Sequence, residues 1–235
     1  MPSLFGGDQQ ALPPAVEALL RRTNPWWAGQ PLPELPPYRR WAFKTALQRL
    51  KNGLAPATVI RGPRQVGKTT IQQQIIEHLL QEEKVAPQRI LQVQFDDMLS
   101  LKEQTPKVQL LKDKEDPLLA ICRWFEDQIL QKTFNTVARA GEPAYIFFDE
   151  VQNLAAWAPQ LKSLVDHNTV RVLVTGSSAL RLEMGRDSLA GRISTLNLGR
   201  CSCARSPSCV FRKSLTPACR RTASGRCCGR SSGAT

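Results

Sequence analysis

The stretch Gly62-Pro-Arg-Gln-Val-Gly-Lys-Thr-Thr70 decides the fold of this 235-residue chain. It matches the pattern Gly-x4-Gly-Lys-Thr, in which glycines let successive backbone N–H groups turn toward an anion. The segment Thr58–Ile60 predicts a short strand before it. A helix is predicted after it by an apolar face at helical spacing, formed by Ile71, Ile75, Ile76, Leu79 and Leu80. This order of strand, glycine loop and helix is the context that a P-loop requires.

The residues of this loop have distinct expected tasks. Its backbone N–H groups and the helix N-terminus behind them favour negatively charged phosphates. We expect Lys68 to reach the β- and γ-phosphates of a nucleotide, and the Thr69 hydroxyl to coordinate Mg²⁺. The residues predicted to bind the nucleotide are Gly62, Pro63, Arg64, Gln65, Val66, Gly67, Lys68, Thr69 and Thr70.

A second motif supplies carboxylates for the metal. Tyr145-Ile-Phe-Phe-Asp149-Glu150 is an apolar strand that ends in two acids, which is the Walker B form. Asp149 is predicted to hold Mg²⁺ through water, and Glu150 to orient and deprotonate the attacking water as general base. The second acid favours hydrolysis over binding alone.

Further catalytic candidates come from the last third of the body. Val172-Leu-Val-Thr-Gly-Ser-Ser178 ends in small polar residues, so Thr175 or Ser177 is expected to sense the γ-phosphate. Arg192 is either a finger that stabilises the transferring phosphate, in this subunit or a neighbour, or a partner in a surface salt bridge. Weaker candidates for such a finger are Arg64, Arg181 and Arg186. Surface or packing roles are expected for His78 and His167.

Strand and helix patterns alternate along the body of the chain. The predicted strands are 58–60, 90–95, 145–148, 170–174 and 194–198. The predicted helices are 15–22, 41–54, 71–80, 155–166 and one long helix that starts at Asp116-Pro117, with Asp116 as N-cap, and ends near Gly141. Such alternation predicts an α/β fold with a parallel sheet covered by helices on both faces.

Composition divides the chain into three parts. Residues 1–40 form a lead that holds eight of the 17 prolines, in which Trp26 and Trp27 are expected to anchor the lead on the core. Residues 41–199 form the predicted P-loop core. Residues 200–235 form a tail with seven Arg, one Lys and no acidic residue, which gives it +8 of the net charge of +12. Six of the seven cysteines are also in this tail.

Four interpretations of the tail compete. Its cysteine spacing does not match a zinc site, and a disulfide framework needs an oxidising compartment that nothing in the sequence supports. Its charge leaves nucleic-acid binding open. We favour a frame-shifted translation, because an Arg/Ser/Cys mixture without apolar periodicity cannot bury enough surface to fold. Inserting one cytosine near codon 199 of a GC-rich gene can restore an apolar, helix-favouring continuation.

The motifs together resemble those of a prokaryotic group of AAA+ ATPases. The resemblance rests on 62–70, Asp149-Glu150-Val-Gln152, 175–178, Ser188-Leu-Ala-Gly-Arg192 and the upstream Asn24-Pro-Trp-Trp27, and it spans about residues 20–199. It implies a P-loop core with the strand order 5-1-4-3-2, and ATP rather than GTP. The group continues into a helical lid and a C-terminal domain, and the chain departs from that pattern after Leu198.

Two functions therefore stand beside each other. The chain is predicted to be a Mg²⁺-dependent ATPase, or else a nucleotide-gated binding or signalling module with little turnover. No apolar run approaches the length of a membrane span, and the N-terminus has no basic region followed by an apolar stretch. We therefore expect a cytoplasmic protein without a membrane partner. Its protein partner and oligomeric state are not specified by these motifs.

Overall fold

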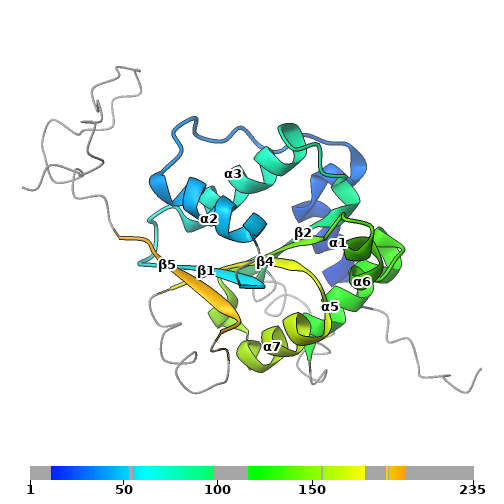
Figure 1. Cartoon of the computed structure of the whole chain (residues 1–235). Helices are drawn as coiled ribbons and strands as arrows, with labels where there is room; N and C mark the ends of the chain where they lie inside the picture. The colour runs from blue at the N-terminus through cyan, green and yellow to red at the C-terminus, as the bar shows by residue number, and fades with distance from the viewer. Residues whose placement is uncertain are drawn as a thin grey trace, which may run out of the picture. The chain divides into compact units, whose positions relative to one another are not determined.

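A parallel sheet organises the chain, as the computed structural model shows (Figure 1). The structure describes residues 12–52, 55–97, 116–154, 156–177, 189 and 191–199. Within these residues five strands form one sheet in the order β2-β3-β4-β1-β5, and all neighbouring pairs are parallel. The strands are β1 (Ala57–Arg61), β2 (Ile90–Gln94), β3 (Tyr145–Asp149), β4 (Arg171–Gly176) and β5 (Ile193–Asn197). This order is the one that the resemblance implied, and the predicted α/β class is confirmed.

Helices cover both faces of the sheet, as predicted (Figure 1). Helices α2 and α3 pack on one face, whereas α1, α5, α6 and α7 pack on the other. The helical segments are α1 (Pro14–Thr23), η1 (Pro25–Ala28), α2 (Trp41–Asn52), α3 (Lys68–Gln81), η2 (Pro87–Arg89), α5 (Pro117–Phe125), η4 (Glu126–Leu130), α6 (Phe134–Arg139), η5 (Val151–Asn153) and α7 (Trp157–His167). No helix among the described residues is long and apolar enough to cross a membrane.

Alternation along each strand produces these two apolar layers. In β3, Ile146 and Phe148 face the layer of α5 and α7, whereas Tyr145 and Phe147 face the layer of α2 and α3. Successive side chains of a strand point to opposite faces, so a central strand with helices on both sides must be apolar throughout. All five residues of β3 are buried.

The lead closes the β2 edge of the sheet with side chains. The Asn24 amide donates to the Gln92 carbonyl at 2.8 Å and accepts from the Gln92 N–H at 2.7 Å. The indole N–H groups of Trp26 and Trp27 both donate to the Ile90 carbonyl, at 3.1 and 2.9 Å. These contacts take the place of hydrogen bonds to a further strand and cover an edge of the kind that can serve as a template for pairing with another chain. The predicted anchoring role of the two tryptophans is confirmed, and Asn24 adds to it.

The long helix expected between Asp116 and Gly141 is a wrong prediction. Helix α5 widens into the π-helical η4, and Gln131 then takes a left-handed conformation with φ of 54°. The chain restarts at α6, where the Thr133 hydroxyl caps the Thr136 N–H at 3.2 Å. A Thr cap two residues after a left-handed residue starts a new helix, and apolar periodicity alone does not reveal this break.

Two smaller expectations also needed correction. Asp116 precedes α5, but its side chain makes no capping bond, and buried Gln160 instead accepts the Leu118 N–H at 2.8 Å. By its spacing, Trp41 is expected on the apolar face of the helix predicted at 41–54, but it is 54% exposed at the first residue of α2. A glycine at position 53 predicts the end of the same helix there, and Gly53 lies outside the described residues.

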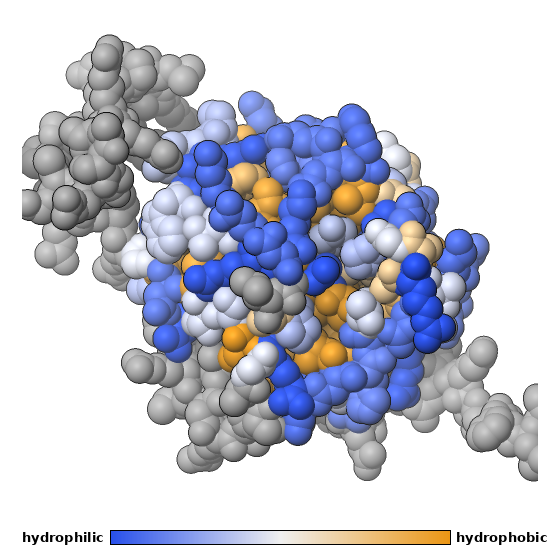
Figure 2. Space-filling model, in the orientation of Figure 1, coloured by the Kyte–Doolittle hydropathy of each residue, from blue (hydrophilic) through white to orange (hydrophobic). Residues whose placement is uncertain are grey.

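The outer surface is largely hydrophilic. Figure 2 shows one face, on which hydrophobic residues appear as patches between polar side chains. Among the described residues, the large hydrophobic side chains that remain exposed are Tyr38 and Trp41. Single apolar residues scattered over a polar surface are normal in folded proteins, so these two residues do not indicate a partner.

Replacing Asn24 with Ala should destabilise the protein by about 2–4 kcal/mol, because it leaves the N–H and C=O of Gln92 buried without their side-chain partner. Urea unfolding followed by circular dichroism measures this difference. The control is Gln30→Ala, an exposed position at the end of the same segment, which should change the free energy of unfolding by less than about 0.5 kcal/mol. Equal effects of the two substitutions would contradict the edge-covering role.

Candidate functional site

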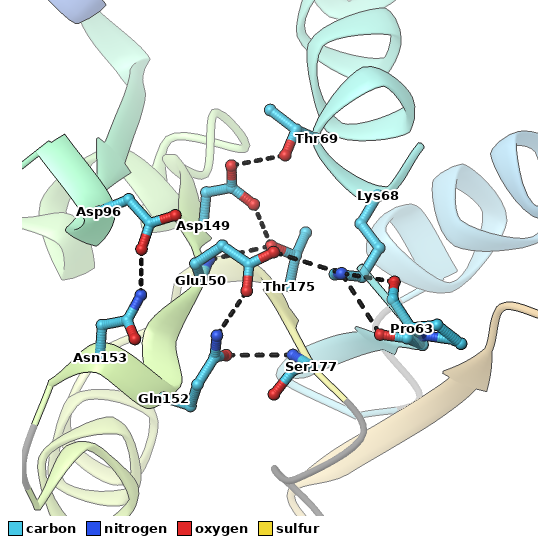
Figure 3. A network of polar contacts seen from close by, with 11 residues as sticks. Pro63, Lys68, Thr69, Asp96, Asp149, Glu150, Gln152, Asn153, Thr175 and Ser177 are labelled. Carbon is cyan, nitrogen blue, oxygen red and sulfur yellow. Dashed lines mark hydrogen bonds and ion pairs between the residues drawn. The ribbon is translucent and has the colours of Figure 1, made fainter. Parts of the chain in front are cut away.

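The residues predicted for the P-loop, the acidic strand end and the sensor meet at the carboxyl edge of the sheet. Strands β3, β4 and β1 are neighbours and run parallel, so the segments that follow them emerge at the same edge. The P-loop follows β1, Asp149 ends β3, and Thr175 is the second-last residue of β4. Figure 3 shows their side chains converging.

The phosphate loop has the backbone that its glycines predict. Gln65 and Gly67 adopt positive φ angles of 61° and 86°, and α3 begins at Lys68 immediately afterwards. The Lys68 ammonium returns over the loop and donates to the carbonyls of Gly62 at 3.3 Å and Pro63 at 3.1 Å. The side chain is only 3% exposed. The loop therefore encloses a buried positive charge at a helix N-terminus, which is an environment for anions.

Asp149 joins the helix that follows the loop to the neighbouring strand. Its Oδ2 accepts a hydrogen bond from the Thr69 hydroxyl at 2.8 Å, and its Oδ1 accepts one from the Thr175 hydroxyl. Burial raises the pKa of Asp149, whereas the hydrogen bonds from Thr175 and Thr69 act in the opposite direction. The structure thus brings together the two residues that the sequence assigned to a metal, Thr69 and Asp149.

Glu150 is held beside Lys68. Its Oε1 lies 3.2 Å from the Lys68 ammonium, and its Oε2 accepts from the Gln152 amide at 2.5 Å. Its backbone is left-handed, with φ of 50°, and its N–H donates to the Thr175 hydroxyl at 3.2 Å. A non-Gly residue in this region is uncommon and costs energy unless its surroundings hold it there. Both oxygens of the expected base therefore have fixed partners.

Three polar residues around Glu150 were not predicted to take part in the site. Gln152 also accepts the Ser177 N–H at 3.1 Å, and Asn153 donates to Asp96, which follows β2 (Figure 3). Burial first, and the charge of Glu150 second, raise the pKa of Asp96. Their positions in the sequence could have indicated a place at the site, because Asp96 follows the strand next to β3 and Gln152 comes two residues after Glu150. Both lie where a parallel sheet gathers its polar strand ends.

The two sensor candidates have different surroundings. Thr175 is fully buried, and its hydroxyl is engaged with Asp149 and the Glu150 N–H. Ser177 lies one residue beyond β4 and is partly exposed, with its N–H bound to Gln152. Thr175 therefore holds other site residues in place, whereas Ser177 lies at the border of the site.

Arg192 is not brought to this site. It precedes β5, and its carbonyl accepts the N–H of Ala57, at the start of β1. The P-loop follows the other end of β1, so a strand length of about 15 Å separates the two. The Arg192 guanidinium pairs with Asp166 at 2.5 Å, which matches the salt-bridge alternative. Arg64 is exposed on the loop, and Arg181 and Arg186 lie outside the described residues.

The two histidines lie away from the loop. His78, on the last turns of α3, packs its ring edge-on against Phe43 with ring centres 5.8 Å apart. Its ring nitrogens are 2.8 Å from Glu82 and 3.2 Å from Glu83, so it has acidic partners that the sequence had not indicated. The ring of His167 bonds the Ser163 carbonyl within α7. Packing and surface roles therefore account for both residues.

Backbone contacts from the end of β5 close the loop. The Leu198 N–H donates to the Arg61 carbonyl at 2.7 Å. Arg40, which sequence reasoning missed, donates to the carbonyl of Val66 and, at 3.0 Å, to that of Gly199. A Cβ atom on Gly62 would lie 2.2 Å from the Leu198 carbonyl oxygen. Glycine is thus needed at 62 because another backbone passes there.

The strand order and the helices on both faces of the sheet define an α/β core of the P-loop NTPase type. The model of the AAA domain family matches residues 55–205, and the chain belongs to this family of nucleotide-binding AAA+ proteins. Among solved structures, the chain is similar to PCH-2 of C. elegans, at 15% identity and a TM-score of 0.41 over 69% of this chain and 42% of that one. The chain thus spans less than half the length of that relative. A comparison with curated proteins returned no match.

Gly62→Ala should destabilise the protein by about 1–3 kcal/mol, because its Cβ cannot avoid the Leu198 backbone without moving the loop. Chemical denaturation measures the effect. Gly199→Ala is the matched control, since a Cβ there meets no atom within 4 Å, and it should be nearly neutral. A Gly62→Ala protein as stable as the control would refute the close approach.

Asp149→Asn should raise the free energy of unfolding at pH 7 by on the order of 1 kcal/mol, because it removes a charge that burial disfavours while an amide can still bond both threonines. The raised pKa means that the folded protein holds this proton more tightly than the unfolded chain. The advantage of Asn should therefore shrink as pH falls through the raised pKa and vanish below 3.8, the ordinary value. Denaturation at several pH values measures it, and a constant difference would contradict this assignment.

Proposed function

We propose that the chain binds ATP together with Mg²⁺ and hydrolyses it at the carboxyl edge of the sheet. The single observation that carries this proposal is the convergence of Lys68, Thr69, Asp149 and Glu150, which come from two segments 80 residues apart. A structural role alone would not require a buried ammonium paired with one acid and a second, buried carboxylate on the adjacent residue, because buried charges are costly.

The residues present fit the metal. Mg²⁺ prefers hard oxygen ligands and commonly keeps several waters beside one or two protein groups and the phosphates. Thr69 and Asp149 offer a hydroxyl and a carboxylate that are 2.8 Å apart. When bound, Mg²⁺ would neutralise charge on the β- and γ-phosphates.

The remaining steps belong to the chain itself. The loop backbone binds the phosphates, and Lys68 pairs with the γ-phosphate. Because Lys68 also contacts Glu150, a γ-phosphate competes with that carboxylate and leaves Oε1 able to accept a proton from water. Glu150 then orients and deprotonates the attacking water, whose oxygen forms a bond to phosphorus as the bond to the β-phosphate oxygen breaks.

Two candidates from the sequence take narrower roles here. Ser177 is the better candidate for contact with the γ-phosphate, since the Thr175 hydroxyl is already engaged. Arg192 can serve only the site of a neighbouring subunit, and it would have to leave Asp166 to do so. ATP is proposed over GTP because no guanine-reading Asn/Thr-Lys-x-Asp motif is visible.

Lys68→Ala should abolish nucleotide binding, whereas Glu150→Gln should keep the affinity for ATP and stop hydrolysis. Calorimetric titration with ATP and Mg²⁺, beside measurement of phosphate release, separates the two effects. Lys44→Ala, at an exposed position of α2, controls for the loss of a lysine and should leave both unchanged.

The outcomes also separate the two candidate functions. Phosphate release by the wild-type protein that is lost in Glu150→Gln supports hydrolysis with Glu150 as base. Tight binding without turnover in both proteins favours the nucleotide-gated module instead. Equal rates of hydrolysis by the wild-type and Glu150→Gln proteins would contradict the assignment of Glu150 as the general base.

A further inference from the structure

We propose that Gln152 is a positioning residue that orients the Glu150 carboxylate and links it to Ser177, the residue that follows β4. This proposal rests on the proposed function, because it concerns the base of the same reaction. Gln152 itself does not touch the reacting atoms in this account. It acts through Glu150.

Both polar ends of the Gln152 side chain are engaged. Nε2 donates to Glu150 Oε2 at 2.5 Å, and Oε1 accepts the Ser177 N–H at 3.1 Å (Figure 3). A carboxylate only accepts and a backbone N–H only donates, so these partners fix which end of the amide is nitrogen. Because the amide group is planar, holding both of its ends fixes its orientation.

The local backbone aims Gln152 at Glu150. The left-handed conformation of Glu150 turns the chain directly into η5, which contains Gln152. The Asn153 N–H returns to the Glu150 carbonyl at 3.1 Å, and the Leu154 N–H returns to the Val151 carbonyl at 3.0 Å. Val151 is fully buried, which fixes the turn on the core. The contact between Glu150 and Gln152 is therefore built into the fold of this turn.

The arrangement divides the two oxygens of Glu150 between different partners. Oε1 faces Lys68, and Oε2 is held by Gln152. When a γ-phosphate engages Lys68, Oε1 is released for the attacking water while Gln152 keeps the carboxylate from rotating. Rotation about the terminal torsion of Glu is otherwise broad. A base misplaced by about 1 Å can cost about 100-fold in rate.

The second hydrogen bond of Gln152, from the Ser177 N–H, connects the oriented Glu150 carboxylate to the end of β4. The Ser177 N–H begins the segment after that strand, where Ser177 is proposed to meet the γ-phosphate. A shift of the Ser177 backbone would move the Gln152 oxygen, and with it the amide that holds Glu150. The base and the proposed sensor are thereby joined through one side chain.

Gln152→Ala tests this link in the full-length chain. It should lower kcat for ATP about 10- to 100-fold while the KM and the affinity for a non-hydrolysable ATP analogue change less than about twofold, because only the orientation of the base is lost. Gln152→Asn is too short to span both partners and should behave similarly. The matched control is Gln81→Ala, at the exposed end of α3, which should retain wild-type kinetics.

A structural role and a positioning role differ in two further readouts. If Gln152 acts only on the orientation of Glu150, Gln152→Ala should lower kcat and leave the affinity for the ATP analogue unchanged, whereas general disruption would lower both. Hydrogen exchange of the Ser177 amide should also quicken in Gln152→Ala, with overall thermal stability close to wild type. This second readout does not depend on hydrolysis.

These results keep the two proposals apart. A wild-type protein that binds ATP but does not hydrolyse it refutes the proposed hydrolysis, while faster exchange at Ser177 in Gln152→Ala still supports the link. The positioning role is overturned by unchanged kcat in Gln152→Ala, by a loss of affinity for the ATP analogue that matches the loss of kcat, or by unchanged exchange at Ser177.

Discussion

The site depends on the hydrogen bonds that the buried carboxylate of Asp149 accepts. This carboxylate accepts hydrogen bonds from Thr69, at the start of α3, and from Thr175, at the end of β4, so one side chain of β3 ties together the P-loop helix and the neighbouring strand. The arrangement is available only because β3, β4 and β1 are adjacent and parallel. The cost of burying this charge is visible in the raised pKa of Asp149. The same buried charge that costs folding free energy is a suitable ligand for a cation.

Contacts outside the regular backbone hydrogen bonds of the sheet hold its β2 edge and its phosphate loop in place. Asn24, Trp26 and Trp27 complete the β2 edge with side-chain hydrogen bonds. At the other side of the sheet, the end of β5 passes so close to Gly62 that no side chain fits. The phosphate loop is therefore confined by backbone from β5 and by Arg40, in addition to its own turn. A loop held in this way spends less conformational entropy when it binds phosphate.

Local patterns were enough to predict most of the fold, and contacts distant in sequence account for what they missed. The P-loop, the acidic end of β3 and the alternation of strands and helices are signals within short windows. The break at Gln131 and the contact between Gln160 and Leu118 depend on tertiary context, which no window contains. An arginine at position 192 suggested a catalytic role, but the pairing of β5 with β1 places Arg192 at the end of β1 that lies away from the P-loop. Gln152 was quoted only as part of a motif, because its partner Ser177 is 25 residues away.

Electron paramagnetic resonance of Mn²⁺, a cation that binds the same oxygen ligands as Mg²⁺, tests whether Thr69 and Asp149 hold a metal together with ATP. Titration of the full-length protein should detect Mn²⁺ bound in a protein-held complex in the presence of ATP. Asp149→Asn should weaken that binding about tenfold or more while the folded structure is retained. Equal Mn²⁺ affinity of the wild-type and Asp149→Asn proteins with ATP would contradict the account.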